Sequence, residues 1–87
     1  MRVGTMRAWD AFMAGIRCKP GRACWTDGEK IFSYSTPIMV WNSDKTLLRF
    51  NINRYSVTTS THQNGLRELL RRSGHAYIET DDVAEFV

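Results

Sequence analysis

The sequence has few of the features that mark an exported or membrane-bound protein. It contains two cysteines in 87 residues and no apolar stretch near the N-terminus that would serve as a secretory signal. No run approaches the roughly 18 apolar residues of a membrane span. We therefore expect a cytoplasmic protein with reduced thiols and no membrane partner. A disulfide between Cys18 and Cys24 is sterically possible, but the chain is far from cysteine-dense.

Metal and catalytic signatures are equally scarce. A zinc site would have to combine the two cysteines with His62 and His75, and their spacing is unlike that of any compact zinc finger, so we predict no metal or other cofactor. Ser60, His62 and Asp81 could be combined as a catalytic set, but no glycine-flanked nucleophile supports it. We expect a protein that is not an enzyme, and an enzyme using His62 is the remote alternative.

The sequence does contain many aromatic residues and an uneven distribution of charge. Three tryptophans, three tyrosines and four phenylalanines supply a large apolar area for one short domain, which we expect to span residues 1–87. Four of the nine acids lie in the last nine residues, so residues 1–78 carry all twelve basic residues against five acids, a net charge of +7. Such a basic body attracts nucleic acid or an acidic protein surface.

An amphipathic helix is predicted near the N-terminus. Thr5 is a plausible N-cap for it. The apolar residues that follow recur at helical spacing and share one face, namely Met6, Trp9, Phe12, Met13 and Ile16. Because proline cannot continue a helix, the helix is expected to end at Lys19-Pro20-Gly21.

Four short strands are predicted in the middle of the chain, over residues 23–25, 30–34, 38–41 and 46–53. Asp27-Gly28, between the first two, is typical of a hairpin turn. In the fourth strand Leu48, Phe50 and Ile52 alternate with polar residues that include Asn51, so one face should be buried and the other wet. The pattern also allows a final strand over residues 75–79 and a short helix after it.

A second helix is predicted from about Thr61 to Ser73. Ser60 and Gln63 have the spacing of a capping box, in which two side chains satisfy backbone N–H groups at a helix start. Gly74 provides the C-terminal cap. The buried face carries the leucines and lies near His62, whose ring is therefore expected to pack rather than to act as a base.

One flank of this second helix is basic. Asn64, Arg67 and Arg71 lie along it at helical spacing. Glu68 is placed to pair with Arg72 four residues on, which leaves Arg67 and Arg71 as unpaired cations.

These elements together predict an α+β fold. The sheet should have three to four mostly antiparallel strands, packed against the N-terminal amphipathic helix and the second, capped helix. Aromatic residues on strands usually pack, although Trp25, Tyr34, Trp41 and Tyr55 would also suit base stacking or a protein contact.

Two segments resemble a known family. They are residues 26–38, TDGEKIFSYSTPI, and residues 53–63, NRYSVTTSTHQ. Both are similar to segments of short uncharacterised proteins from bacteriophages and other mobile elements of bacteria and archaea, which carry T-D-G…L-Y-S-Y-x-T-x-I and then Y-S-x-T-T-S-x-H-Q. Ile31-Phe32 replaces the usual Leu-Tyr, a conservative change. The resemblance implies a phage-encoded origin without an established activity. It also implies that seven residues of the second segment are important, namely Tyr55, Ser56, Thr58, Thr59, Ser60, His62 and Gln63.

The sequence thus predicts a phage-encoded accessory protein that binds a host macromolecule, either nucleic acid or host protein. Hydroxyl groups before a helix often serve only to cap it, but with free amides and arginines nearby they also suit a phosphate or a carboxylate. The candidate binding residues are Arg54, Tyr55, Thr58, Thr59, Ser60, Asn64, Arg67 and Arg71. The alternative is a protein–protein contact or a homodimer formed through aromatic sheet surface and sheet edges.

Overall fold

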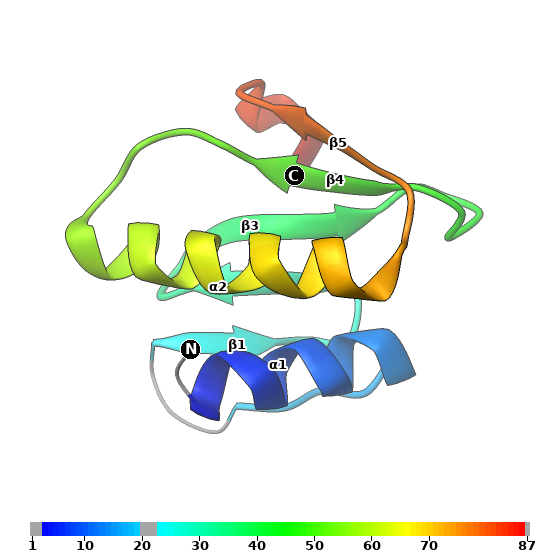
Figure 1. The fold of residues 1–87 in the computed structure, drawn as a ribbon, viewed down its shortest axis with the longest axis horizontal. Helices are drawn as coiled ribbons and strands as arrows, with labels where there is room; N and C mark the ends of the chain where they lie inside the picture. The colour runs from blue at the N-terminus through cyan, green and yellow to red at the C-terminus, as the bar shows by residue number, and fades with distance from the viewer. Residues whose placement is uncertain (1–2, 20–22, 87) are drawn as a thin grey trace.

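The computed structural model describes residues 3–19 and 23–86, apart from the side chain of Glu85. The elements in chain order are α1 (Val3–Ala14), β1 (Cys24–Thr26), β2 (Lys30–Ser33), β3 (Thr36–Trp41), β4 (Leu48–Asn51), α2 (Val57–Ser73), β5 (Tyr77–Thr80) and the 3-10 helix η1 (Val83–Phe86). Figure 1 shows α1 and α2 in front of one face of the sheet, with η1 behind it. The predicted α+β class is confirmed.

The sheet has five strands in the order β1-β2-β3-β4-β5, so the predicted number of three to four is wrong. The first four strands form an antiparallel meander, and β5 pairs with β4 in parallel. β5 has four residues and none of them is buried. It overlaps the final strand that the sequence pattern allowed over residues 75–79, and η1 lies where the pattern allowed a short helix after that strand.

The turn at Asp27 and Gly28 joins β1 to β2 as predicted. Asp27 Oδ1 accepts hydrogen bonds from the backbone N–H groups of Glu29 and Lys30, both at 2.8 Å. Gly28 has a φ of 99°, and a Cβ built there would lie 3.0 Å from the carbonyl oxygen of Gly15. The turn therefore packs against the chain that leaves α1, and glycine is the residue that fits there.

α1 begins and ends earlier than predicted. Thr5 lies inside the helix and is 2% exposed, so it is not the N-cap. The chain leaves the helix at Gly15, whose φ of 70° is left-handed and does not continue a helix. The predicted terminator at Pro20 lies outside the described residues.

The buried face of α1 is narrower than predicted. Trp9 and Phe12 are buried between the helix and the sheet, and Met13 packs against the same core. Met6 and Ile16 are exposed. Ile16 lies beyond the end of the helix, so the helical spacing that grouped it with the others does not apply to it.

The alternation predicted for the fourth strand fails at its end. Leu48 and Phe50 are fully buried, as expected. β4 ends at Asn51, so Ile52 falls in the following loop and is exposed. Asn51, predicted to face water, is 1% exposed because its side chain is hydrogen-bonded inside the protein.

α2 begins one turn earlier than predicted. Its N-cap is Ser56, whose Oγ accepts a hydrogen bond from the backbone N–H of Thr59 at 3.1 Å. Ser60 therefore lies within the helix, and the capping box with Gln63 was a wrong prediction. Several hydroxyl residues in a row can each cap a helix, so spacing alone does not identify the one that does. Gly74 ends α2 in the left-handed conformation, as predicted.

No helix in the described parts of the chain is both long and apolar enough to cross a membrane. Cys18 and Cys24 are free thiols. Among residues 3–19 and 23–86, no group of three or more histidine, cysteine, aspartate or glutamate side chains could hold a metal ion.

Candidate functional site

A polar hollow of about 250 Å³ lies where the chain passes from β4 into α2. One wall is the loop after β4, the other is α2, and the lining residues are Ile52, Asn53, Arg54, Ser60, Gln63, Asn64 and Arg67. Four of the candidate binding residues are therefore brought together here, namely Arg54, Ser60, Asn64 and Arg67. Two guanidinium groups, a hydroxyl and side-chain amides share one small surface.

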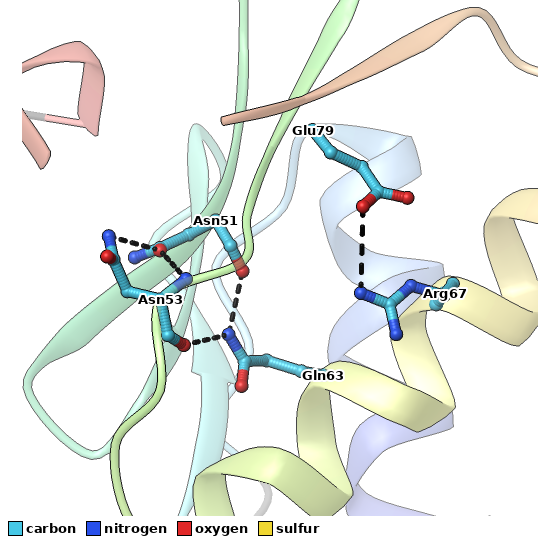
Figure 2. A network of polar contacts seen from close by, with 5 residues as sticks. All are labelled: Asn51, Asn53, Gln63, Arg67 and Glu79. Carbon is cyan, nitrogen blue, oxygen red and sulfur yellow. Dashed lines mark hydrogen bonds and ion pairs between the residues drawn. The ribbon is translucent and has the colours of Figure 1, made fainter. Parts of the chain in front are cut away.

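Asn51 and Asn53 hold the loop wall in place. The Asn51 amide Nδ2 donates to the carbonyl of Pro37 and to the hydroxyl of Tyr55, both at 3.0 Å. Asn51 Oδ1 accepts from the backbone N–H of Asn53 at 2.9 Å and from its side-chain amide at 3.0 Å (Figure 2). The Asn53 amide also donates to the carbonyl of Asp81 at 2.8 Å. The loop is thus fixed by side-chain hydrogen bonds and by the backbone bond from the Ile52 N–H to the carbonyl of Thr80 at 3.0 Å.

Gln63 connects α2 to this loop. Its Nε2 donates to the carbonyl oxygens of Asn51 at 2.7 Å and of Asn53 at 3.0 Å, as Figure 2 shows. Gln63 is buried, so these bonds satisfy backbone acceptors that have little access to water. The glutamine assigned to a capping box from sequence instead holds the two walls of the hollow together.

Arg67 is held between the sheet and the hollow. Its guanidinium carbon lies 5.2 Å from the centroid of the buried Phe50 ring, within the range of a cation–π contact. Its Nη2 lies 3.8 Å from Oε2 of Glu79 on β5 (Figure 2). The prediction that Arg67 is an unpaired cation was therefore wrong. The pair is longer than a hydrogen bond, however, and no hydrogen bond within the described residues occupies the guanidinium donors.

Arg54, Ser60 and Asn64 complete the polar lining. Arg54 is exposed in the loop, and Asn64 is exposed on α2. Within the described residues, none of these three side chains makes a hydrogen bond or an ion pair. Free donors that converge on one hollow are suited to an anion such as a phosphate or a carboxylate.

Arg71 lies outside this lining and is not the unpaired cation that the sequence predicted. Its Nη1 is 3.9 Å from Oε2 of Glu68, one turn earlier on α2. The predicted pair between Glu68 and Arg72 is confirmed, with Arg72 Nε donating to Glu68 Oε1 at 3.2 Å. Both pairs are exposed, so each contributes little to stability. Their main effect is that Glu68 offsets part of the positive charge of Arg71 and Arg72.

Thr59 belongs to a buried hydroxyl cluster and not to the hollow. Ser33 Oγ on β2 donates to Thr59 Oγ1 at 2.9 Å and lies 2.7 Å from Nδ1 of His62. Ser56 Oγ lies 3.1 Å from Thr59 Oγ1. Ser33, Thr59 and His62 are each at most 3% exposed, so the cluster fastens the start of α2 to the sheet. The expectation that the His62 ring packs is confirmed.

Tyr55 and Thr58 do not line the hollow. Tyr55 is exposed, and its hydroxyl accepts the hydrogen bond from Asn51 described above. Thr58 is half-buried in the first turn of α2.

Four residues that shape this region were not recognised as such from the sequence, namely Asn51, Asn53, Gln63 and Glu79. An Asn-x-Asn segment at a strand end was a usable signal, because asparagine side chains often bond the backbone two residues on. Glu79 has no local signal. It faces Arg67 because β5 pairs with β4 in a register that places Glu79 beside Phe50.

A larger and more open groove, about 560 Å³, lies between α1 and α2. Its lining residues are Met6, Thr61, Asn64, Gly65, Glu68, Leu69 and Arg72. The one cation in this lining, Arg72, already donates to Glu68. The groove therefore offers an anion no free positive charge, and the smaller hollow is the stronger candidate for an anion site.

The sheet face turned away from the helices carries a stacked aromatic pair. Trp25 on β1 and Phe32 on β2 are cross-strand neighbours, with ring centroids 4.3 Å apart. Ser33 next to Phe32 bonds α2, so alternation places the aromatic pair on the opposite face. Lys19 Nζ lies 5.2 Å from the Trp25 ring centroid. Trp41, by contrast, stacks on the buried ring of Phe12 at 5.7 Å.

One protein family has a model that matches this chain. The match covers residues 12–84, and the family is described as a family of unknown function, DUF8033. Neither a curated protein nor a solved structure matches the chain.

Proposed function

The chain belongs to the DUF8033 family, whose function is unknown, and we propose that it is a non-enzymatic binding protein whose polar hollow holds a phosphate of a nucleic-acid backbone. The observation that carries this proposal is the convergence of Arg54, Arg67 and Asn64 on one hollow, where no hydrogen bond within the described residues uses the donors of these three side chains. Arginine, serine and amide side chains are the groups that commonly bind backbone phosphates.

The fixed loop supports the proposal. Asn51, Asn53 and Gln63 hold the two walls together through buried or half-buried hydrogen bonds. A binding group that is already in position loses less conformational entropy when the ligand arrives. The arrangement therefore favours a hollow that is formed before binding.

The chemistry of the hollow also indicates which part of a nucleic acid it contacts. Guanidinium and amide donors form hydrogen bonds with phosphate oxygens, and the phosphate is the same at every nucleotide of a strand. We therefore expect binding that is largely independent of base sequence. The net charge of +7 over residues 1–78 adds a general attraction to a polyanion. His62 is 1% exposed, which supports a role in packing rather than in catalysis.

The similarity of residues 26–63 to phage and mobile-element proteins supports an origin in such an element. We propose that the target is then nucleic acid in the host cytoplasm. The similarity carries no activity with it, so the proposed target rests on the hollow and on the positive charge of residues 1–78.

The proposal is tested by fluorescence anisotropy with labelled single- and double-stranded DNA and RNA at low salt. Affinity should fall steeply with salt, because phosphate contacts release counterions. Arg54→Gln should weaken binding roughly fivefold and reduce the double-stranded slope of log K against log salt by about one. Arg7→Gln is the matched control, since Arg7 is exposed on α1 and outside the lining.

Two results would contradict the proposal. One is the absence of binding to all four nucleic acids at low salt. The other is an equal loss of affinity in Arg54→Gln and Arg7→Gln, which would mean that net charge and not the hollow governs binding.

The second candidate function is a protein–protein contact through the sheet face that carries Trp25 and Phe32. The supporting observation is that α1 and α2 cover the other face, while on this face η1 packs on β3 and β4 and Ile78 and Val83 are exposed. Association with a host protein, or as a homodimer, should then depend little on salt and should hide Trp25. A monomer by sedimentation whose Trp25 fluorescence is unchanged by host extract would remove this candidate.

A further inference from the structure

Two tyrosines near the start of α2 are exposed to solvent. Tyr34, in the turn between β2 and β3, is 48% exposed, and Tyr55, in the loop before α2, is 42% exposed. The other two aromatic residues whose sequence position suits base stacking, Trp25 and Trp41, stack on rings of the protein itself. Of these four residues, the two tyrosines are therefore the ones whose rings are open to a ligand.

Hydrogen bonds bring the two tyrosines to the same end of the molecule. Ser33, next to Tyr34, donates to the hydroxyl of Thr59 at 2.9 Å. Ser56, next to Tyr55, bonds the same hydroxyl at 3.1 Å. Both tyrosines are thus one residue away from a cluster at the first turn of α2, at the end of the helix where the loop from β4 arrives (Figure 1).

The Tyr55 ring is held in place through its hydroxyl and lies close in the chain to the hollow. Asn51 Nδ2 donates to that hydroxyl at 3.0 Å. Because Asn51 is buried, the bond fixes one end of an otherwise exposed ring. Arg54, which lines the hollow, directly precedes Tyr55. A ring that is already ordered loses less conformational entropy when a base stacks on it.

Tyr34 is held in a backbone conformation that tyrosine rarely adopts. Its φ of 57° is left-handed, which costs free energy for a residue with a Cβ, and glycine or asparagine would adopt it more readily. Its N–H donates to the carbonyl of Ala23 and its carbonyl accepts from Trp25 Nε1, both at 2.7 Å. The ring centroid lies 6.2 Å from that of the buried His62 ring. Since Tyr34 is half exposed, core burial does not account for a tyrosine here, which favours a role for the ring in binding.

We infer that Tyr34 and Tyr55 stack on unpaired bases, so that the nucleic acid bound by this protein is single-stranded. This inference rests on the function proposed above, in which the hollow holds a backbone phosphate. In a duplex the faces of the bases are covered by the neighbouring base pairs, whereas a single strand can turn its bases onto aromatic rings. Stacking tolerates any base, because every base has a π face. It is therefore compatible with the sequence-independent contact expected of the hollow.

The test compares three labelled ligands of equal length by fluorescence anisotropy at low salt. They are an oligothymidylate, an abasic strand that keeps the phosphates but has no bases, and a duplex. The wild type should bind the oligothymidylate most tightly. The loss of one base–aromatic stack should weaken that binding at least about fivefold and should leave binding of the abasic strand nearly unchanged.

Each tyrosine is replaced once with retention of the ring and once without it. Tyr55→Phe and Tyr55→Leu both lose the hydrogen bond with Asn51, but only Tyr55→Leu loses the aromatic face. Tyr34→Phe keeps the ring, and Tyr34→Asn removes it with a residue that tolerates the left-handed conformation. The two phenylalanine variants should bind like the wild type. Thermal unfolding of Tyr34→Asn should change little, which separates a binding role from a structural one.

The outcomes are distinct from those of the proposed function. Unchanged binding of the oligothymidylate in Tyr34→Asn or in Tyr55→Leu overturns the inference, and so does duplex binding as tight as single-strand binding. Equal affinity for the oligothymidylate and the abasic strand also overturns it, while the proposed function, which needs only the phosphate, then stands. If none of the three ligands binds, both fail.

Discussion

Replacing Asn51 by alanine should destabilise the protein far more than its polar character suggests. Asn51 is 1% exposed, and its side chain makes four hydrogen bonds, to Pro37, Tyr55 and twice to Asn53. A hydrogen bond contributes about 0.5–1.5 kcal/mol net, and deletions within one network are not additive. We therefore expect Asn51→Ala to cost about 2–4 kcal/mol of unfolding free energy.

That loss should be easy to measure. Domains of this size lose about 4–8 °C in Tm for each kcal/mol, so Asn51→Ala should lower Tm by roughly 8–32 °C. Urea unfolding followed by circular dichroism gives the free energy directly. The matched control is Asn64→Ala, because Asn64 is exposed and makes no hydrogen bond within the described residues, and it should change stability by less than about 0.5 kcal/mol.

The same variant links stability to binding. If Asn51 positions the loop that carries Arg54, the folded Asn51→Ala protein should bind nucleic acid more weakly even though every lining residue is retained. Equal stability of Asn51→Ala and Asn64→Ala would refute the role of Asn51 as the anchor of the loop.

Three further predictions concern the local structure. In urea unfolding, Ser56→Ala should cost about 1 kcal/mol because it removes the N-cap of α2, and Ser60→Ala should cost less than about 0.5 kcal/mol. The reverse order would indicate that Ser60 caps the helix instead. Gly28→Ala should cost about 1–3 kcal/mol, because the φ of Gly28 is positive and the new Cβ would lie 3.0 Å from a backbone oxygen. Gly4→Ala is the control, since a Cβ at Gly4 would have nothing within 4 Å, and it should be neutral or slightly stabilising. Similar thermal unfolding of the two variants would refute this. Burial raises the pKa of the Cys24 thiol to about 11, and a side-chain hydrogen bond with Thr5 opposes this increase only in part. At a pH between the two pKa values, the folded state therefore keeps the thiol proton that the unfolded chain loses. Stability should therefore fall between about pH 9 and pH 11, and a fall just as steep in Cys24→Ala would contradict that cause.

Features that depend on a few neighbouring residues could be predicted from the sequence. The Asp27-Gly28 turn, the Gly74 cap and the pair between Glu68 and Arg72 each form within four or five residues. Their physical cause is present in the local sequence, since it is the backbone freedom of glycine or the reach of one side chain along a helix.

Features that depend on the assembled sheet could not be predicted in the same way. Arg67 looked unpaired because Glu79 lies twelve residues away and meets it only through the parallel pairing of β4 and β5. Asn51 looked exposed because alternation assigns a face but does not reveal that a hydrogen-bond network fills it. Four of the predicted binding residues therefore line one hollow, while the contacts that hold its walls together required the structure.

The central claim is that the hollow itself contacts nucleic acid, and side-chain NMR tests it most directly. The Nε–H of Arg67 is buried without a hydrogen-bond partner in the described part of the chain, so its signal should be protected from exchange with water. On titration with an oligonucleotide, the side-chain signals of Arg54, Arg67 and Asn64 should shift together and saturate at the affinity measured by anisotropy. Shifts confined to the Trp25 indole and the strands around it, with these three signals unmoved, would contradict the account.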